Sequence, residues 1–222
     1  MKLVHNEIEN QFNFTDNINT LVIEDSKTFY SYCLDFYTQV NGEMGKFVLS
    51  EGDNIISFSQ NVEVVFDFFR LSINDKKFIS KLYHHLATLA DKKFYIKKAE
   101  MISSITNLFE ELNCESDFPI DFKEDSGLTE IMKAFNVKLL ENYDNLLKKI
   151  TSYLDAIVNF SVVKLICFVN LKCFLSSKEL KELYQYIRYN EIAVFFLENT
   201  LRPKIEDEFI VVIDSDLCEI IV

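Results

Sequence analysis

Val62-Glu-Val-Val-Phe-Asp-Phe-Phe-Arg-Leu71 reads as a buried strand, and the next residues, Ser72-Ile-Asn-Asp75, lead into a long helical pattern. A strand that runs into a helix is where a nucleotide-binding α/β protein carries its phosphate loop. That loop needs glycines, because backbone amides surround a phosphate only where the chain approaches without a Cβ. None of the four glycines of the chain follows a strong strand into a helix. The pattern therefore predicts a nucleotide-type fold that lacks the phosphate-binding chemistry.

Apolar runs at both ends of the chain predict a sheet. Strands are expected at residues 20–24, 46–49, 54–58, 62–69, 163–169, 193–197, 209–213 and 217–222. Asp25 or Ser26 can cap a helix that runs to about Val40, and Ser176 or Ser177 can cap a second helix to Arg188. Strands with nearly continuous apolar residues, separated by helices, favour a parallel sheet that is covered on both faces.

The middle third of the chain is helical in pattern. Apolar residues keep helical spacing over residues 75–112 and again over 143–160. A straight helix of the first length would extend roughly 55 Å, so it must leave the globular part or be broken. We therefore expect an α/β head built from residues 1–74 and 160–222, with an α-helical leg at 75–159 inserted between its two parts.

Composition places the chain among globular proteins outside membranes. Its 222 residues are 49% hydrophobic, and the formal net charge is −12. We expect a cytoplasmic protein, because no signal peptide is visible at the start and no apolar run reaches the roughly 20 residues that span a bilayer. The five cysteines form no C-x-x-C pair, which favours buried free thiols over zinc or a disulfide framework.

Charge is distributed unevenly along the predicted leg. Residues 76–98 carry seven lysines against Asp91, a local charge of +6. Such a segment could follow the phosphates of a nucleic acid, and it could equally be a solvated helix face. The candidate DNA-binding residues that rest on charge alone are Lys92, Lys93, Lys97 and Lys98.

An acidic segment follows directly. Between Glu110 and Glu130 there are eight acidic residues and one lysine, a local charge of −7. Carboxylates on a loop repel one another unless a hard cation joins them, and Ca²⁺ accepts six to eight oxygens in a flexible geometry. The spacing is not that of an EF-hand, so a calcium site and a solvated acidic loop both remain open.

Catalytic signatures are missing from the sequence. His84 and His85 are adjacent on a helix and point about 100° apart, so they do not ligate one metal from one face. His5 falls in a probable edge segment, and all three histidines are expected at surface or boundary positions. The nucleophile motif G-x-S-x-G is absent.

Five stretches together resemble a known family. They are Thr20–Asp25, Val65–Asn74, Leu128–Lys138, Lys164–Ser176 and Ala193–Glu198, and they cover nearly the full chain in order. The family they resemble is the Csn-two family, the small DNA-end-binding ring protein of type II-A CRISPR adaptation. The likeness is carried by apolar strands and turns more than by a catalytic signature.

The resemblance implies a fold, a ligand and partners. Relatives have a P-loop-NTPase-like head without nucleotide binding, carry a helical leg, and form homotetrameric rings around the end of a DNA duplex. They work beside the CRISPR adaptation integrase and the RNA-guided nuclease. By position, the lysines that match the lining of the hole are Lys133 and Lys138. The carboxylates that match calcium-binding positions are Asp121, Glu124, Asp125 and Glu130.

The resulting hypothesis is a non-enzymatic, sequence-independent binder of double-stranded DNA ends, supported by Ca²⁺ and using no nucleotide. Lysines from several subunits would surround the duplex, so phosphate contacts would dominate and no base need be read. Two alternatives stay open at this point. One is a nucleotide-dependent enzyme with a divergent phosphate loop, and the other is a protein-interaction adaptor.

Overall fold

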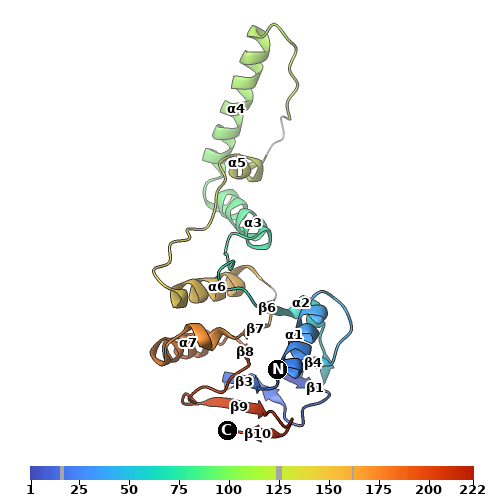
Figure 1. Cartoon of the computed structure of the whole chain (residues 1–222). Coiled ribbons are helices and arrows are strands. Elements are labelled where there is room, and N and C mark those ends of the chain that lie inside the picture. The colour runs from blue at the N-terminus through green and yellow to red at the C-terminus, as the bar shows by residue number, and fades with distance from the viewer. Residues whose placement is uncertain (16–17, 124–126, 162) are drawn as a thin grey trace. The chain divides into compact units, whose positions relative to one another are not determined.

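The chain divides into two units in the computed structural model, which describes residues 1–15, 18–123, 127–161 and 163–222. The first unit, here called the head, comprises Met1–Leu71 and Asn142–Val222 (Figure 1). The second, here called the leg, comprises Ser72–Glu141.

Helix α6 (Leu146–Phe160) belongs to the head, although the sequence placed it in the leg. Its apolar face is buried there, with Ile150 and Leu154 fully covered. The hydroxyl of Tyr153 also donates to the Glu63 carboxylate at 2.8 Å. The expectation was wrong because an amphipathic pattern shows that a helix buries one face and does not show against which unit.

A six-stranded sheet forms the centre of the head. Its strand order is β10 (Glu219–Ile221), β9 (Glu208–Ile213), β3 (Ile18–Ile23), β8 (Val194–Glu198), β7 (Leu165–Val169) and β6 (Val62–Val65). The last five strands of that order pair in parallel, whereas β10 is antiparallel to β9. Every residue of β3, β7 and β8 is buried, as continuous apolar runs predict. The expected α/β class with a parallel sheet is confirmed, and the likeness to P-loop proteins remains a prediction.

A second, antiparallel sheet lies beside it, in the order β2 (Phe12–Asn13), β1 (Lys2–His5), β4 (Phe47–Glu51) and β5 (Asn54–Ile55). The sequence predicted one strand over residues 54–58. The structure instead ends β5 at Ile55 and begins a short helix, α2 (Phe58–Asn61), because Phe58 turns inward and is buried.

Helices cover both faces of the six-stranded sheet. Helix α1 (Ser26–Val40) and the small sheet lie on one face, and α6 and α7 (Ser177–Tyr189) lie on the other (Figure 1). Both predicted caps are present. The Asp25 carboxylate accepts from the amide of Thr28 at 2.8 Å, and Ser176 forms a capping box with Glu179.

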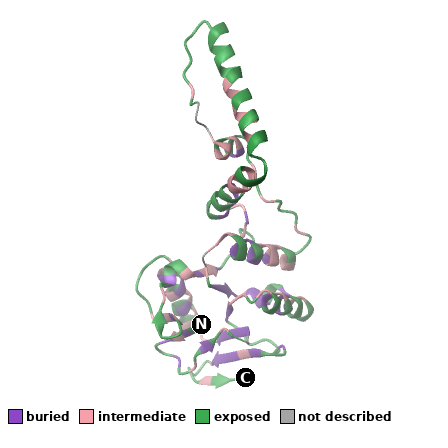
Figure 2. Cartoon of the chain, turned by 180° about the vertical axis from the view of Figure 1, so that it is seen from behind, coloured by how far each residue is buried: buried purple, intermediate pink, exposed green. Residues whose placement is uncertain are grey.

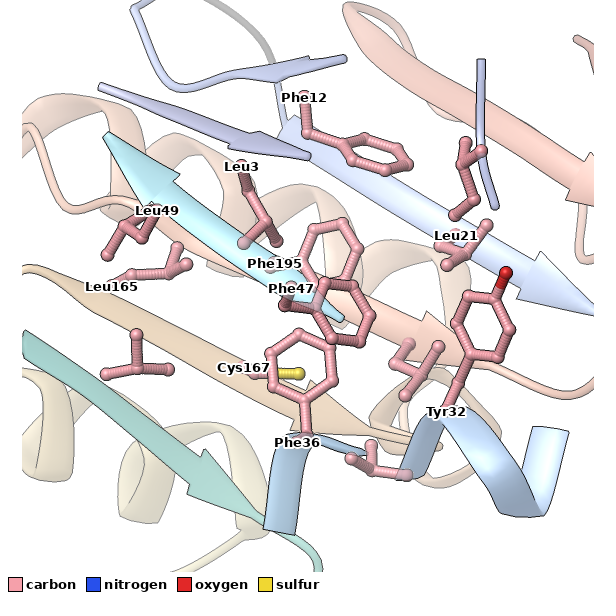
Figure 3. Close-up of a cluster of buried hydrophobic side chains, with 14 of the residues drawn as sticks. Leu3, Phe12, Leu21, Tyr32, Phe36, Phe47, Leu49, Leu165, Cys167 and Phe195 are labelled. Atoms are coloured by element: carbon pink, nitrogen blue, oxygen red, sulfur yellow. The ribbon is translucent and has the colours of Figure 1, made fainter. Parts of the chain in front are cut away.

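Aromatic rings fill the space between α1, the small sheet and the large sheet (Figure 3). The ring of Phe36 lies 4.1 Å from that of Phe47 and 5.8 Å from that of Phe195. Phe12 meets Phe195 edge to face at 4.9 Å. Each such pair adds about 0.5–1.5 kcal/mol beyond the burial of its area. This packing joins the two sheets into one head.

Strand β6 stops at Val65, four residues before the expected end. The cause is Asp67, whose carboxylate accepts from the amides of Phe69 and Arg70 and so forms a turn. The chain after β6 then leads into the leg. The loop expected to resemble a phosphate loop is thus a connection between units.

The described residues of the leg form the helices α3 (Lys76–Lys93), α4 (Tyr95–Glu115) and α5 (Leu128–Ala134). The helical pattern over residues 75–112 is broken at Phe94, whose φ of −133° and ψ of 26° are not helical. We expected a helix of this length either to leave the globular part or to be broken, and the break is confirmed. None of the residues 95–115 is buried, and Figure 2 shows α4 as largely exposed.

Among the residues that the structure describes, no helix combines the length and the apolar character needed to cross a bilayer.

Candidate nucleic-acid interface

The entry and exit of the leg are held together by side chains. The Glu141 carboxylate accepts from the Ser72 hydroxyl at 2.8 Å and from the amide of Ile73 at 2.7 Å. The Asn74 amide group bonds both the carbonyl and the N–H of Leu139, at 3.0 and 2.9 Å. These contacts fix the two ends of the leg against each other.

The hydrogen bonds between Asn74 and Leu139 also position the neighbouring Lys138. Tyr83 of α3 is buried, and its hydroxyl donates to the carbonyl of Val137 at 3.1 Å. Lys138 therefore lies between two residues whose backbones are held, Val137 and Leu139, while its own side chain is exposed. A lysine on a fixed backbone presents its charge at a defined place.

Helices α3 and α5 enclose a groove of about 560 Å³. Lys76 and Lys133 both line it, so the fold brings a lysine near the start of α3 together with one on α5. The remaining lining residues are Ile79, Ser80, Tyr83, His84, Ala87 and Thr129. The described lining contains two lysines, one histidine and no carboxylate, so this surface favours an anion.

The other candidate lysines form a separate group where α3 meets α4. Lys92 and Lys93 end α3, whereas Lys97 and Lys98 lie in the first turn of α4. Along α3, Lys93 is roughly 25 Å from Lys76 at 1.5 Å per residue. The structure thus separates the six predicted DNA-binding lysines into two groups.

Most of these lysines lack a counter-charge. Lys98 pairs with Asp91 across the helix break at 2.5 Å. Outside residues 16–17, 124–126 and 162, no ion pair within 4.0 Å involves Lys92, Lys93 or Lys97, nor Lys133 or Lys138. Unpaired exposed lysines can bind phosphates without first breaking an internal contact.

The acidic loop is held against the end of α4. The Phe109 and Phe122 rings lie 5.4 Å apart, and the Ile120 amide donates to the Asn113 side chain at 2.9 Å. The neighbouring carboxylate of Asp121 is exposed.

Of the other three predicted calcium ligands, the structure describes Glu130. The Glu130 carboxylate accepts from the amide of Gly127 at 3.1 Å, at the start of α5. Glu124 and Asp125 lie outside the described residues. In the described part of the chain, no three histidine, cysteine or acidic side chains gather as a metal site would require.

His5 is buried, contrary to the expectation of a surface histidine in an edge segment. It lies in β1, between β2 and β4, with 2% of its surface exposed. Its ring lies 4.1 Å from that of Tyr32, and its Nε2 is 3.5 Å from the Asp35 carboxylate. Burial lowers the pKa of this histidine. The other two, His84 and His85, are exposed as expected.

The N-terminus of α1, directly after β3, carries a carboxylate of the chain itself, that of Asp25. A helix N-terminus ordinarily attracts phosphate with its unpaired amides. Here the Asp25 carboxylate takes the amide of Thr28 at 2.8 Å and its hydroxyl at 2.7 Å. Those hydrogen bonds lower the pKa of Asp25, so an anion of the chain itself occupies the position.

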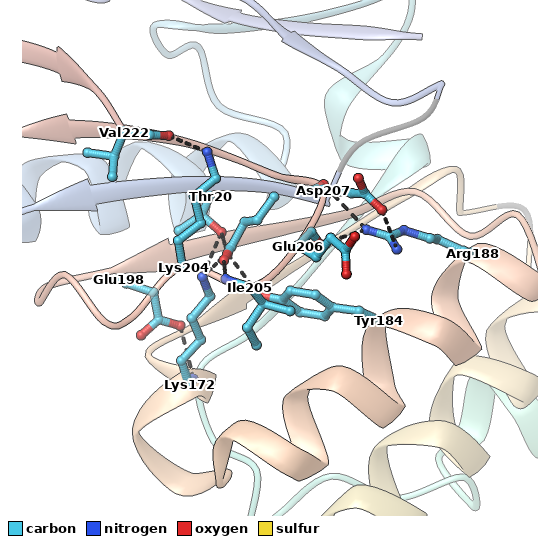
Figure 4. Close-up of polar contacts among 11 residues, drawn as sticks. Thr20, Lys172, Tyr184, Arg188, Glu198, Lys204, Ile205, Glu206, Asp207 and Val222 are labelled. Atoms are coloured by element: carbon cyan, nitrogen blue, oxygen red, sulfur yellow. Dashed lines mark hydrogen bonds and ion pairs between the residues drawn. The ribbon is translucent and has the colours of Figure 1, made fainter.

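A buried polar cluster in the head was missed by sequence reasoning. Lys172, Thr20 and Tyr184 converge in Figure 4, and all three side chains contact the carboxylate of Glu208. The backbone amide of Lys172 also donates to Glu198 at 3.1 Å. Lys172, a charge in the middle of a largely apolar run, could have signalled this cluster.

Comparison with known proteins places this chain in a family. The model of the CRISPR-associated protein family Cas_Csn2 matches residues 39–217, which is most of the chain and includes the whole leg. The chain belongs to the Cas_Csn2 family. It is also 24% identical over 156 residues to the CRISPR-associated protein Csn2 of Enterococcus faecalis, covering 69% of each chain. The suspected Csn-two resemblance is thereby confirmed, and a role in a CRISPR system follows from Cas_Csn2 membership.

Proposed function

We propose that this protein serves CRISPR adaptation, the acquisition of spacers, by binding the ends of double-stranded DNA without regard to sequence and without catalysis. In this proposal it acts in the cytoplasm as a homotetrameric ring whose hole is lined by lysines. It would hold DNA for the adaptation integrase and the RNA-guided nuclease of the same system. Membership of the Cas_Csn2 family supports the CRISPR role alone.

The single observation that carries DNA binding is the set of exposed, unpaired lysines on the leg. Lys133 and Lys138 are set on backbone that α3 positions through Tyr83. Phosphate contacts of this kind give affinity without base recognition. The net charge of −12 does not oppose them, since exposed charges more than about 8–10 Å away are screened at physiological salt.

A partly exposed apolar stripe on α4 supports assembly with further copies. The stripe has four residues at spacings of four, three and four: Met101, Ile105, Leu108 and Leu112. This is the spacing with which helices pack side by side in coiled coils. Leu108 and Leu112 are 52% and 49% exposed in the single chain, so a second copy could cover them.

Calcium enters the proposal through the acidic loop. Asp121 is exposed, and the Glu130 carboxylate, although bonded to Gly127, keeps a second oxygen for a cation. Bound Ca²⁺ would neutralise part of a segment that carries a charge of −7. The two described carboxylates alone are fewer than Ca²⁺ requires, so Glu124 and Asp125 would have to complete the set.

The test compares linear and covalently closed circular duplexes of the same sequence in a gel-shift titration, with and without a calcium chelator. We expect the linear duplex to bind more tightly, with affinity falling steeply as salt rises. Equal affinity for both forms, with little salt dependence, would contradict the proposal. A size measurement on the same sample tests the tetramer.

A charge-reversal pair separates DNA binding from a pure adaptor role. Lys133→Glu with Lys138→Glu should abolish DNA binding while the oligomer persists. The matched control is Lys178→Glu with Lys181→Glu, which makes the same charge change at exposed positions of α7 in the head. An unchanged affinity in the leg variant would favour the adaptor.

A further inference from the structure

The groove between α3 and α5 has an apolar floor and a basic rim. Ile79 and Ala87 are half-buried on α3, and Tyr83 is buried between them. The two lysines of the groove, Lys76 and Lys133, are exposed and come from different helices. A groove with this division suits a ligand that has an apolar body and an anionic group.

The polar groups of the groove match a phosphate in particular. Lysine binds phosphate as a point charge, and the hydroxyls of Ser80 and Thr129 can donate to its oxygens. His84 adds a ring nitrogen at the same rim. No carboxylate among the described lining residues would repel the phosphate, and the Glu130 carboxylate is turned to the amide of Gly127.

The size of the groove indicates what the ligand carries besides a phosphate. Its volume of about 560 Å³ lies within the range of small-molecule sites, roughly 300–1,000 Å³. An isolated phosphate would leave the apolar floor of Ile79 and Ala87 uncovered. A duplex interior offers no single nucleotide that can enter, since its bases are paired and stacked. A terminal nucleotide has a stacking neighbour on one side only, so it can leave its pair and enter at a lower cost.

We propose that the α3–α5 groove binds one nucleoside 5′-phosphate, with the phosphate at Lys76 and Lys133 and the nucleoside over Ile79 and Ala87. This inference rests on the proposed DNA-end function and deepens it. The ring would recognise the chemical end of a strand, namely its 5′-phosphate, as well as the topological end. A free mononucleotide carries the same group and is the other source of such a ligand.

The first experiment measures binding to hairpin duplexes with one open end, carrying either a 5′-phosphate or a 5′-hydroxyl. We expect about tenfold tighter binding of the phosphorylated end, the effect of one good charge-assisted contact. Lys76→Ala should bring the ratio of the two affinities close to one. Lys81→Ala is the matched control, because Lys81 lies on the same helix about 140° away around its axis and should leave the ratio unchanged.

The second experiment titrates thymidine 5′-monophosphate into the wild-type protein by calorimetry, with thymidine and inorganic phosphate as separate controls. Binding of the monophosphate, lost in Lys76→Ala and much weaker for either control, supports the groove as a nucleotide site. Binding of the free nucleotide together with equal affinity for the two hairpin ends would overturn the DNA-end assignment. No binding of the nucleotide and equal affinity for the two ends would overturn the inference entirely.

Failure of this inference is distinguishable from failure of the proposed function. If linear duplex is preferred over circular but the 5′-phosphate makes no difference, the ends are recognised by threading alone and the groove is not the site. If linear and circular duplexes bind equally, the DNA-end function itself is wrong.

Discussion

Lys172 and Glu208 form an ion pair inside the head, with side chains only 5% and 1% exposed. Lys172 follows β7 and Glu208 begins β9, so the pair joins the ends of two strands that are not neighbours in the sheet. Thr20 and Tyr184 bond the same carboxylate at 2.6 and 2.8 Å. All three side chains therefore meet one oxygen of the carboxylate, Oε1, while the other accepts from the amide of Ile205 at 3.3 Å.

Removing the lysine of this pair should destabilise the head severely. Lys172→Met leaves the buried Glu208 carboxylate without its counter-charge, which typically costs about 3–5 kcal/mol of unfolding free energy. Denaturant titration followed by circular dichroism measures this loss. The double variant Lys172→Met with Glu208→Gln should recover part of it, because the unpaired charge of Glu208 is then removed as well. A single variant as stable as wild type would show that the pair is dispensable.

Glu198 should make the stability of the head depend on pH. Burial raises the pKa of this carboxyl from 4.5 to about 7, so the folded protein holds a proton that the unfolded chain has released between those values. Stability from this group therefore falls as pH rises from 4.5 to about 7. Glu198→Gln keeps an oxygen for the Lys172 amide and should flatten that part of the profile. An identical profile in the variant would assign the dependence elsewhere.

The salt dependence of DNA binding should resolve the two lysine groups. For duplex DNA, each phosphate contact contributes about 0.9 to the slope of log K against log salt. We expect alanine at Lys133 and Lys138 to reduce the slope, with no effect on sequence preference. Alanine at Lys92 and Lys93 should reduce it further only if the α3–α4 joint also touches the backbone. A slope unchanged by the first pair would remove α5 from the interface.

Calcium should stabilise the leg through the acidic loop. Millimolar calcium chloride is expected to raise the melting temperature relative to a chelator, because it relieves repulsion among the carboxylates there. Asp121→Asn should reduce the increase. Glu130→Gln is an informative companion, since glutamine still accepts from the Gly127 amide and so separates capping from metal binding. The same increase with magnesium chloride would argue against a calcium-specific site.

The cap of α1 should carry a measurable share of the stability of the head. Asp25→Ala removes the acceptor for the Thr28 amide and hydroxyl and should cost about 1–2 kcal/mol. Asp25→Asn keeps the acceptor without the charge and should cost less. Urea denaturation ranks the three proteins. A larger loss of unfolding free energy for Asp25→Asn than for Asp25→Ala would show that the side-chain acceptor of residue 25 does not stabilise α1.

Local chemistry explains what the sequence could predict. Helices α1 and α7 begin where Asp25 and Ser176 were expected to cap them, because a capping side chain acts on amides within three residues. The buried strands β7 and β8 follow from continuous apolar runs. The end of β6 could not be predicted in this way. The apolar residues continue past Val65, but the hydrogen bonds of Asp67 turn the chain there and end the strand.

The candidate site depended more on packing between distant residues. Lys133 was found through the family resemblance, but its meeting with Lys76 requires α5 to lie along α3, and no local pattern encodes that contact. The break at Phe94 has neither glycine nor proline to announce it. The charge pattern therefore put all the lysines of residues 76–98 into one group. The structure places Lys76 in the groove and Lys92, Lys93, Lys97 and Lys98 where α3 meets α4.

The Asp25 carboxylate at the start of α1 has a consequence for how the protein responds to its surroundings. A fold completed by a bound nucleotide gains stability in proportion to the logarithm of ligand concentration, so its folded population follows the metabolic state of the cell. At this helix the anion is part of the chain, and its contact is intramolecular. The contribution of that contact to stability is therefore independent of the concentration of any ligand.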